Sequence, residues 1–379
     1  MGSATENNPK TLDGRDAAEA IRHALPVVLP TETVFGIGAD ASSPKALDRL
    51  WSIGKGSHRQ PLAWHIGSTA VLHSALDDLQ HTLSPVQNRL VGQLCPGPML
   101  LAIEMDSQTL ERFQKQFGIA PGVVDEGGAL LVRVVANRET QNTLDLAGVP
   151  VVLRAIPAAG SPRTTDEAVR AIERIDTNET VAGVLASDQR ALGQSSTLVR
   201  FLKSGSYRVD REGAYSQRYI DKQIMRTILF VCTGNTCRSP MAAAIARELI
   251  ERSPLDLPTT VRSAGAFTSG GMPATPEAVH AVESLGYAMG PHQSSVLTRE
   301  MINQADEVYG LTASHVEAIR AIDPTAGDKI MLLDPDGRDV PDPIGQSQSV
   351  YDETAKRLQE LIQRRLSEHR QTVPGEGPQ

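Results

Sequence analysis

Residues 227–239 read TILFVCTGNTCRS, and this stretch decides the fold of the C-terminal part of the chain. The apolar run 227–231 has the β-branched and aromatic content of a buried strand, and the alanine-rich run 240–251 is typical of a helix. A strand, a short loop and a helix in this order direct the loop N–H groups and the positive helix end toward one anion. Cys232 and Arg238 stand six positions apart across that loop. The pattern predicts a phosphate site with the Cys232 thiol at its base, in a field that favours the nucleophilic thiolate.

The composition is that of a globular protein with two domains. The chain has 379 residues, which is too long for one ordinary core. Its N-terminal residues lack a basic-then-apolar signal pattern, and no apolar run approaches the ~20 residues that span a bilayer. We therefore expect a cytoplasmic location and no membrane partner. The net charge of −8 disfavours nonspecific nucleic-acid binding by the overall field, although a local basic groove stays compatible with it.

The cysteines Cys95, Cys232 and Cys237 are too few and too scattered for a disulfide framework or a structural zinc site. Cys95 lies in an apolar context, which favours a small buried hydrophobic residue. Cys232 and Cys237 share the loop, and no histidine-rich segment follows them at zinc-finger spacing. We therefore predict no metal site.

The change of composition along the chain predicts five segments. Apolar and helical patterns alternate in two long stretches, and a polar, glycine-containing stretch separates them. The predicted segments are a flexible N-terminus (1–12), a first α/β domain (13–205), a linker (206–225), a second α/β domain (226–370) and a disordered tail (371–379). In the second domain, periodicity predicts helices at 276–285, 299–306 and 351–368 and strands at 306–311 and 329–333.

The stretch 228–241 (ILFVCTGNTCRSPM) resembles the signature of the low-molecular-weight protein tyrosine phosphatases and of their protein arginine phosphatase relatives. Three later motifs are similar to motifs of the same family: Ser263-Ala264-Gly265, residues 271–274 (GMPA) and Asp342-Pro343. Ordered motifs over about 145 residues are far more specific than a bare Cys-x5-Arg pattern. The resemblance implies a Rossmann-like parallel sheet and a protein phosphatase that forms a phosphocysteine intermediate.

Three residues carry the chemistry that this resemblance implies. Cys232 is the expected nucleophile, and the planar guanidinium of Arg238 presents a fork to two phosphate oxygens, as a lysine cannot. Asp342 is the expected general acid for the leaving group and then the general base for the water that hydrolyses phosphocysteine. Asp339 is the competing acid. Neither step needs a cofactor or a metal.

The other loop residues are expected to bind phosphate or to support the loop. The resemblance implies that Ser239 donates its hydroxyl to the Cys232 thiolate and that Asn235 braces the loop. The whole supporting set is Thr233, Gly234, Asn235, Thr236, Cys237 and Ser239. Related phosphatases use a cysteine at the position of Cys237 to form a reversible disulfide with the nucleophile. Cys237 is therefore either a redox partner of Cys232 or simply a small loop residue.

Substrate choice depends on Thr236. In the tyrosine-specific branch the matching position usually holds a larger aliphatic residue, whereas Thr-Gly-Asn-Thr-Cys-Arg resembles the arginine phosphatase branch. The Asp-Pro pair is followed by Ile344-Gly345 and not by the aromatic residues that flank phosphotyrosine in the tyrosine branch. The leading substrate is therefore phosphoarginine in a phosphorylated protein. The alternative is that Thr236 is a neutral variation and that the enzyme prefers phosphotyrosine or a small phosphoester.

Residues 26–41 (PVVLPTETVFGIGADA) resemble the opening of the YrdC-like threonylcarbamoyl-AMP synthase family. The likeness covers about 190 residues. Further similar motifs lie at 61–62, 95–98, 133, 161–165 and 196–197. The resemblance implies a twisted α/β sheet and a site for threonine, bicarbonate and ATP with Mg, which this family uses in tRNA modification.

The residues that match the ligand site of that family are Thr31, Thr33, Lys55, Arg59, Arg133 and Ser196. The Pro-Thr-x-Thr turn, matched by Thr31 and Thr33, belongs to the threonine site. The Lys-x-Arg motif for the nucleotide is not intact, because Lys55 is followed by glycine and serine. Arg59 is the nearest substitute for the missing arginine.

The second nucleotide motif, Ser-x-Asn, is replaced by Ala155-Ile156-Pro157. Alanine and proline side chains cannot hydrogen-bond a nucleotide, and Pro157 lacks the backbone donor as well. Arg154 adds a positive charge, but the sequence does not show where its side chain points. We interpret the domain as an impaired or inactive synthase that binds a small molecule, recruits tRNA or a substrate protein, or serves as a scaffold. The alternative is a bifunctional protein that retains threonylcarbamoyl-AMP synthase activity.

Overall fold

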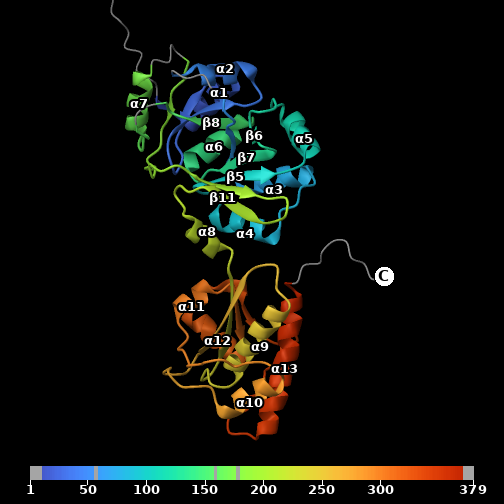
Figure 1. The fold of residues 1–379 in the computed structure, drawn as a ribbon. Coiled ribbons are helices and arrows are strands. Elements are labelled where there is room, and N and C mark those ends of the chain that lie inside the picture. Colours follow the sequence, from blue (N-terminus) through green and yellow to red (C-terminus); the bar gives the residue numbers. More distant parts are fainter. Residues whose placement is uncertain (1–10, 55–58, 158–159, 176–179, 370–379) are drawn as a thin grey trace, which may run out of the picture. The chain divides into compact units, whose positions relative to one another are not determined.

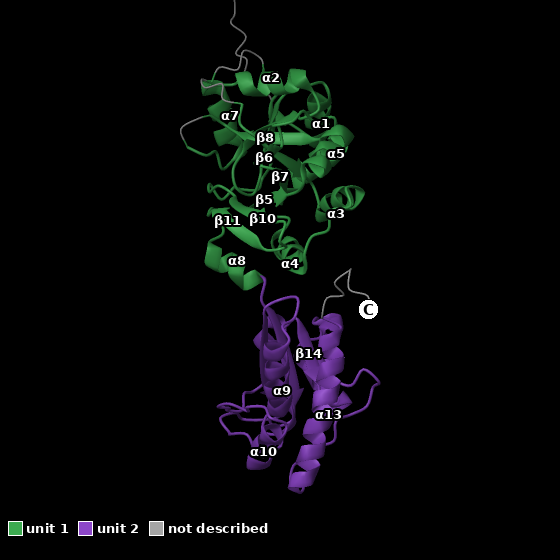
Figure 2. Ribbon diagram, turned by 45° about the vertical axis from the view of Figure 1, so that its right-hand side comes forward, with its two compact units in different colours: residues 1–223 green, residues 224–379 purple. Residues whose placement is uncertain are grey.

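The computed structural model describes residues 11–54, 59–157, 160–175 and 180–369. The chain divides into two compact units, unit 1 at 1–223 and unit 2 at 224–379 (Figure 2). In the described part of the chain, no helix is both long and apolar enough to cross a membrane.

Unit 1 is a mixed α/β domain. Its helices are α1 (Gly14–Arg22), α2 (Pro44–Ser52), α3 (Thr69–Asp78), α4 (Pro85–Leu94), α5 (Ser107–Phe117), α6 (Arg138–Ala147), α7 (Thr165–Arg174) and α8 (Gln217–Gln223). Its strands are β1 (Thr11–Leu12), β2 (Val27–Leu29), β3 (Gly36–Asp40), β4 (Ala63–Ile66), β5 (Met99–Glu104), β6 (Asp125–Glu126), β7 (Ala129–Val134), β8 (Val151–Ala155), β9 (Val184–Leu185), β10 (Thr197–Phe201) and β11 (Tyr207–Arg211).

The strands described in unit 1 form one sheet in the order β1-β9-β2-β3-β8-β4-β7-β5-β10-β11, and β6 pairs with β7 (Figure 1). Parallel and antiparallel pairs alternate irregularly, so strands that are distant in sequence become neighbours. β7 and β8 lie on either side of β4 in the middle of the sheet. Residues of β4, β7 and β8 line one cavity together with residues of the turn that follows β2.

Two features of unit 1 differ from the expected segments. Residues 11–12, expected within a flexible N-terminus, form β1 and pair with β9. The expected linker, 206–225, contains β11 and α8, because the polar side chains of β11 suit an edge strand that pairs with β10 on one side only. The remaining residues of the expected N-terminus (1–10) and all of the expected tail (371–379) lie outside the described residues.

Unit 2 is built on parallel strands. Its strands are β12 (Arg226–Cys232), β13 (Thr259–Gly265), β14 (Glu307–Gly310) and β15 (Ile330–Leu332). Its helices are α9 (Arg238–Arg252), α10 (Pro276–Ser284), α11 (Arg299–Gln304), α12 (Ala313–Ile322), the 3₁₀ turn η1 (Gly327–Lys329) and α13 (Gln348–Ser367). The strand order is β13-β12-β14-β15, and every pair is parallel. The predicted α/β fold with a Rossmann-like parallel sheet is confirmed.

Alternate residues of β12 divide the core of unit 2 into two layers. Ile228 and Phe230 pack with α9, α10 and α13, and Leu229 and Val231 pack with α11 and α12. Alanines 242–244 and 246 of α9 are buried, and these small side chains let the helix approach both the sheet and α13 (Figure 1). Because the strands are parallel, the loops after β12, β13 and β14 gather at the carboxyl edge of the sheet.

Candidate functional site

The loop between β12 and α9, residues 232–238, encloses a buried thiol. Cys232 ends β12 with only 2% of its surface exposed, and its Sγ lies 2.9 Å from Ser239 Oγ in the first turn of α9. The N–H of Asn235 donates a hydrogen bond to the same sulfur at 3.3 Å. Two groups that stabilise a thiolate therefore converge on Cys232, next to the N-terminus of a 15-residue helix.

Asn235 holds this loop in shape. Its φ of 56° places it in the left-handed region, where asparagine is more acceptable than most residues, and its side chain is fully buried. The amide nitrogen donates to Ser239 Oγ and Ser263 Oγ, both at 2.9 Å, and the amide oxygen accepts from Ser295 N at 2.8 Å. The brace therefore ties the loop to α9, to β13 and to the segment before α11.

Gly265 allows β13 to approach the loop closely. A Cβ at this position would lie 2.8 Å from Thr233 O and 3.0 Å from the carbonyl carbon of Gly234. Both are backbone atoms that cannot move away without distorting the loop. The glycine of the Ser-Ala-Gly motif is thus required by the backbone of the loop itself.

Arg238 is buried, with 4% of its surface exposed, and it reaches the loop after β15. Its Nη1 donates to Val340 O at 3.1 Å, and its Nη2 lies 2.5 Å from Asp342 Oδ2 and 3.3 Å from Thr233 Oγ1. Its Nε is buried and has no hydrogen-bond partner among the described residues. Nε and Nη2 form one edge of the guanidinium fork, so the orphaned donor and its neighbour are suited to two oxygens of one anion.

The structure distinguishes the two candidate acids. Asp342 contacts Arg238 and remains 39% exposed, so its carboxylate lies beside the loop and within reach of solvent. Asp339 instead accepts a hydrogen bond from Ala313 N at 2.7 Å, at the start of α12. The structure brings Asp342 together with Arg238, whereas Asp339 holds the start of α12.

Thr236, Gly234 and Cys237 complete the loop. Thr236 is half-buried, and its backbone oxygen accepts from Thr275 N at 3.0 Å. Cys237 is a free, buried thiol, 3.5 Å from Tyr351 OH and 3.7 Å from Thr275 Oγ1. Burial and the Cys237 thiol raise the pKa of Tyr351 to about 12, so this phenol is a neutral hydrogen-bond partner. The disulfide expected between Cys237 and Cys232 stays a prediction.

Two histidines that the sequence analysis missed support the loop. His292 Nε2 lies 2.7 Å from Asn235 O. His315, which is 2% exposed, lies between Thr233 Oγ1 (2.9 Å from Nε2) and Thr312 Oγ1 (2.8 Å from Nδ1). Burial and the nearby Arg238 lower the pKa of His315 to about 4. The only sequence signal for His315 is the Thr-x-x-His pattern that opens α12, which does not point to a loop 82 residues away.

In unit 1, four of the predicted ligand residues line one cavity of about 410 Å³: Thr31, Thr33, Arg133 and Ser196. Arg133 Nη2 donates to Glu32 Oε1 at 2.6 Å and to Thr33 Oγ1 at 2.7 Å, and its buried Nε has no partner among the described residues. His65 lines the same cavity, and burial together with Arg133 lowers its pKa to about 3. The cavity therefore presents hydroxyls, a neutral imidazole and a paired arginine.

Arg154 also lines this cavity, whereas Arg59 is not among the residues that line it. Arg59 is largely exposed, pairs with Asp48 at 2.9 Å and lies over the Trp51 ring at 4.9 Å. Arg154 Nη1 donates to the carbonyls of Leu50 and Ile53 at 3.0 and 3.1 Å, so it caps the end of α2. Lys55 lies outside the described residues. The substitution of Arg59 for the missing arginine of the ligand site stays a prediction.

Cys95 is 9% exposed, as expected for a small buried hydrophobic residue, and burial raises the pKa of its thiol to about 12. Among the described residues, no group of three or more His, Cys, Asp and Glu side chains is placed to hold a metal ion.

Unit 2 has a buried thiol in a loop that enters a helix, and an arginine of that helix bound to a carboxylate, at the edge of a parallel sheet. This arrangement fits a cysteine-dependent phosphatase. The family model described as Low molecular weight phosphotyrosine protein phosphatase matches residues 227–373. The model of the YrdC family, described as Telomere recombination, matches residues 19–213, just over half of the chain. The chain belongs to both families, as a fusion of a YrdC-family domain with a low-molecular-weight phosphatase domain.

Known proteins similar to this chain match its phosphatase domain. A protein-arginine-phosphatase of Bacillus subtilis (strain 168) is 42% identical over 139 residues, which cover 36% of this chain and 91% of that protein. A protein-arginine-phosphatase of Geobacillus stearothermophilus is 41% identical over 150 residues, which cover 38% of this chain and 96% of that protein. The low molecular weight protein-tyrosine-phosphatase Ptp of Acinetobacter johnsonii is 31% identical over 138 residues, which cover 36% of this chain and 93% of that protein. Unit 2 is thus a protein phosphatase.

The lowered pKa of His315 predicts a measurable acid sensitivity. The unfolded chain takes up a proton on this residue near its ordinary pKa of 6.5, whereas the folded state excludes that proton until about pH 4. The free energy of unfolding should therefore fall as the pH drops from about 6.5 to about 4, and His315→Gln should reduce that fall. An NMR titration of the His315 imidazole checks the cause: it should show a neutral ring down to about pH 5. A midpoint near 6.5 would contradict it.

Proposed function

We propose that unit 2 removes phosphate from phosphoarginine in proteins. The observation that carries this proposal is the greater identity to two protein-arginine-phosphatases, at 42% and 41%, than to a protein-tyrosine-phosphatase, at 31%. The residues beside the site agree with it. Thr236 offers a small polar side chain where a guanidinium must fit, and Ile344 follows the Asp-Pro pair in place of an aromatic side chain.

The proposed reaction has two steps. The Cys232 thiolate attacks phosphorus, the phosphorus–nitrogen bond breaks, and Asp342 gives its proton to the departing guanidine nitrogen. Asp342 then takes a proton from water as that water attacks the phosphocysteine, the sulfur–phosphorus bond breaks, and the thiolate returns with release of inorganic phosphate. Apart from the attacking water, every group in these two steps belongs to the chain or the substrate.

Arg238 changes partner in the proposed reaction. In the structure its Nη2 contacts Asp342, and its Nε is buried without a partner among the described residues. A bound phosphoryl group takes the Nε–Nη2 edge and holds the phosphorus in line with Cys232 Sγ. Asp342 is thereby freed from Arg238 to face the leaving group. Ser239 and the N–H of Asn235 stabilise the thiolate in the meantime.

Exchange of Thr236 tests the proposed substrate. The wild-type chain should have a higher kcat/KM on a phosphoarginine peptide than on the matched phosphotyrosine peptide. Thr236→Ile should lower kcat/KM for phosphoarginine by about tenfold or more, because the added carbon fills the guanidinium space and the hydroxyl is lost. The kcat/KM for the phosphotyrosine peptide should stay unchanged or rise.

Thr236→Ser is the matched control, since it keeps the hydroxyl and adds no volume, and it should keep the phosphoarginine preference. Cys232→Ala should abolish both reactions. A wild-type chain that prefers phosphotyrosine, with Thr236→Ile leaving the ratio unchanged, would overturn the phosphoarginine assignment and favour the tyrosine alternative.

We further propose that unit 1 no longer works as a threonylcarbamoyl-AMP synthase and keeps a cavity for a small polar ligand. Three observations support this proposal. Pro157 packs against Gly54: its Cγ lies 2.7 Å from the position that a Cβ on residue 54 would occupy. Arg154 is engaged with the end of α2, and Arg59 with Asp48 and Trp51. Arg154 and Arg59 thus make structural contacts within the domain.

Ligand titration tests this proposal on the full-length Cys232→Ala chain, in which the phosphatase cannot consume nucleotide. Calorimetry should detect no binding of ATP with Mg at millimolar concentration, with or without threonine and bicarbonate. The double variant Ala155→Ser with Pro157→Asn returns the missing side-chain groups and serves as the comparison. ATP binding together with pyrophosphate release by the parent chain would establish the bifunctional alternative.

A further inference from the structure

The segment 333–342, here called the acid loop, carries Asp342 from the end of β15 to its place beside Arg238. Two backbone hydrogen bonds bracket it: Leu333 N donates to Gly310 O at 2.9 Å, and Val340 N donates to Leu311 O at 2.8 Å. Pro341 and Pro343 flank Asp342 and restrict its backbone. The place of the carboxylate therefore depends on how the rest of the acid loop is held.

One of the contacts that hold the acid loop is also part of the phosphate site. Arg238 binds Val340 O and the Asp342 carboxylate. In the proposed reaction, the phosphoryl group binds the guanidinium of Arg238. The contact between Arg238 and Asp342 is therefore lost at the stage at which Asp342 must act as the acid. Contacts that are independent of Arg238 must then keep the acid loop in place: the two backbone hydrogen bonds, the hydrogen bond from Ala313 N to Asp339, and an attachment of the first half of the loop.

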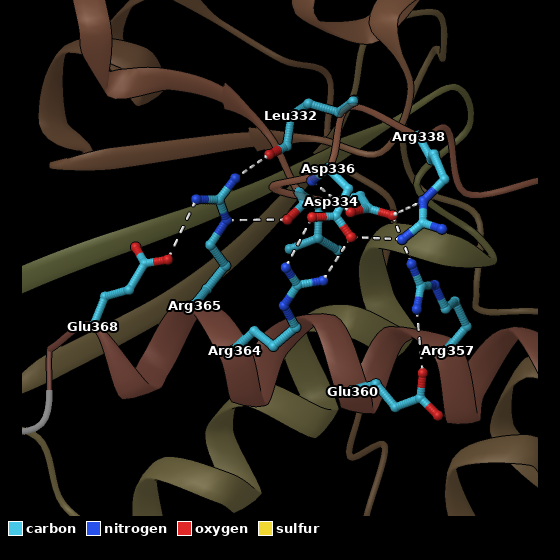
Figure 3. Close-up of polar contacts among 10 residues, drawn as sticks. Leu332, Asp334, Asp336, Arg338, Arg357, Glu360, Arg364, Arg365 and Glu368 are labelled. Atoms are coloured by element: carbon cyan, nitrogen blue, oxygen red, sulfur yellow. Dashed lines mark hydrogen bonds and ion pairs between the residues drawn. The ribbon is translucent and has the colours of Figure 1, made fainter.

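Helix α13 provides that attachment (Figure 3). The Asp334 carboxylate is 1% exposed and lies 2.6 Å from Arg357 Nη2. It also accepts from Asp336 N at 2.8 Å and from Arg338 Nε at 3.3 Å, which closes the turn on itself. A buried carboxylate with three donors has one defined position, so the Asp334–Arg357 pair fixes the first half of the acid loop against the helix.

Two other arginines of α13 lie on the same side of the helix, because seven and eight residues correspond to about two turns. Arg364 forms two hydrogen bonds of 3.0 Å with Asp336, whose side chain is 47% exposed. Arg365 donates to Leu332 O and Leu333 O at 2.7 and 3.0 Å. Figure 3 shows these side chains rising from α13 toward the acid loop. Of the two aspartates that pair with α13, only Asp334 is buried, and its partner Arg357 is 36% exposed.

We propose that Asp334 and Arg357 are positioning residues for Asp342, which keep the acid in reach of the leaving group after the phosphoryl group has engaged Arg238. The inference rests on the proposed role of Asp342. A general acid must lie within hydrogen-bond distance of the atom that it protonates. Loss of the Asp334–Arg357 pair should therefore impair protonation of the leaving group while the thiol and the phosphate loop stay intact.

The test compares the full-length wild type with Asp334→Asn and Arg357→Gln on two aryl phosphates, phenyl phosphate and p-nitrophenyl phosphate. Phenolate is the poorer leaving group and depends more on the acid. We expect kcat/KM for phenyl phosphate to fall about tenfold or more, and for p-nitrophenyl phosphate by less than about threefold. Arg357→Lys keeps the charge and should recover part of the loss.

Asp336→Asn and Arg364→Gln are the matched controls, because they break an exposed ion pair between the same loop and the same helix. They should change kcat/KM for both esters by less than about threefold. Thermal unfolding verifies that each variant is folded. If Asp334→Asn does not fold, the result for Arg357→Gln tests the inference. In that variant Asp334 keeps its other two hydrogen-bond donors, Asp336 N and Arg338 Nε.

An equal fall on both esters, or no fall, in a folded Arg357→Gln chain would overturn the inference and leave the proposed function intact. A wild-type chain that hydrolyses neither these esters nor a phosphoarginine peptide would instead overturn the proposed function, and with it the role of Asp342 on which the inference depends.

Discussion

The buried side chain of Asn235 is the contact on which the chemistry of unit 2 depends. It links the phosphate loop to α9 through Ser239, to β13 through Ser263 and to the chain before α11 through Ser295. These hydrogen bonds keep residue 235 in a left-handed conformation, which aims its own N–H at the Cys232 sulfur. Each such bond contributes only about 1 kcal/mol net, but together they fix one loop shape in the absence of phosphate. A preformed anion site needs no reorganisation when substrate binds.

Arg238 likewise has contacts that hold it in place, and it has one contact, with Asp342, that is exchanged in the proposed reaction. The ends of the arginine side chain are anchored differently: Nη1 is bound to a backbone oxygen, Nη2 to a partly exposed carboxylate, and Nε to no described residue. Asp342, the carboxylate partner, is 39% exposed to solvent. The contacts of α13 with the acid loop do not involve the phosphate site, so they persist through the reaction that we propose.

The sequence predicted most of what is local and little of what is distant. Cys232 and Arg238 were predicted from their spacing within one loop, and the resemblance to the phosphatase family implied the roles of Asn235 and Ser239. His315 was missed because its partner is Thr233, on another element, and nothing in the spacing links them. The expected linker proved to hold β11 and α8, since an exposed edge strand has the polar composition of a linker. The direction of Arg59 and Arg154 likewise needed the fold.

The central claim is that Cys232 is the nucleophile and that Asp342 completes its turnover. The most direct measurement is mass spectrometry of the full-length Asp342→Asn chain, mixed with a phosphoarginine peptide, quenched in acid and digested. The account predicts a phosphoryl group on the sulfur of Cys232, and none in the Asp342→Asn chain that also carries Cys232→Ala. Release of phosphate with no adduct at Cys232, or an adduct on another residue, would contradict it.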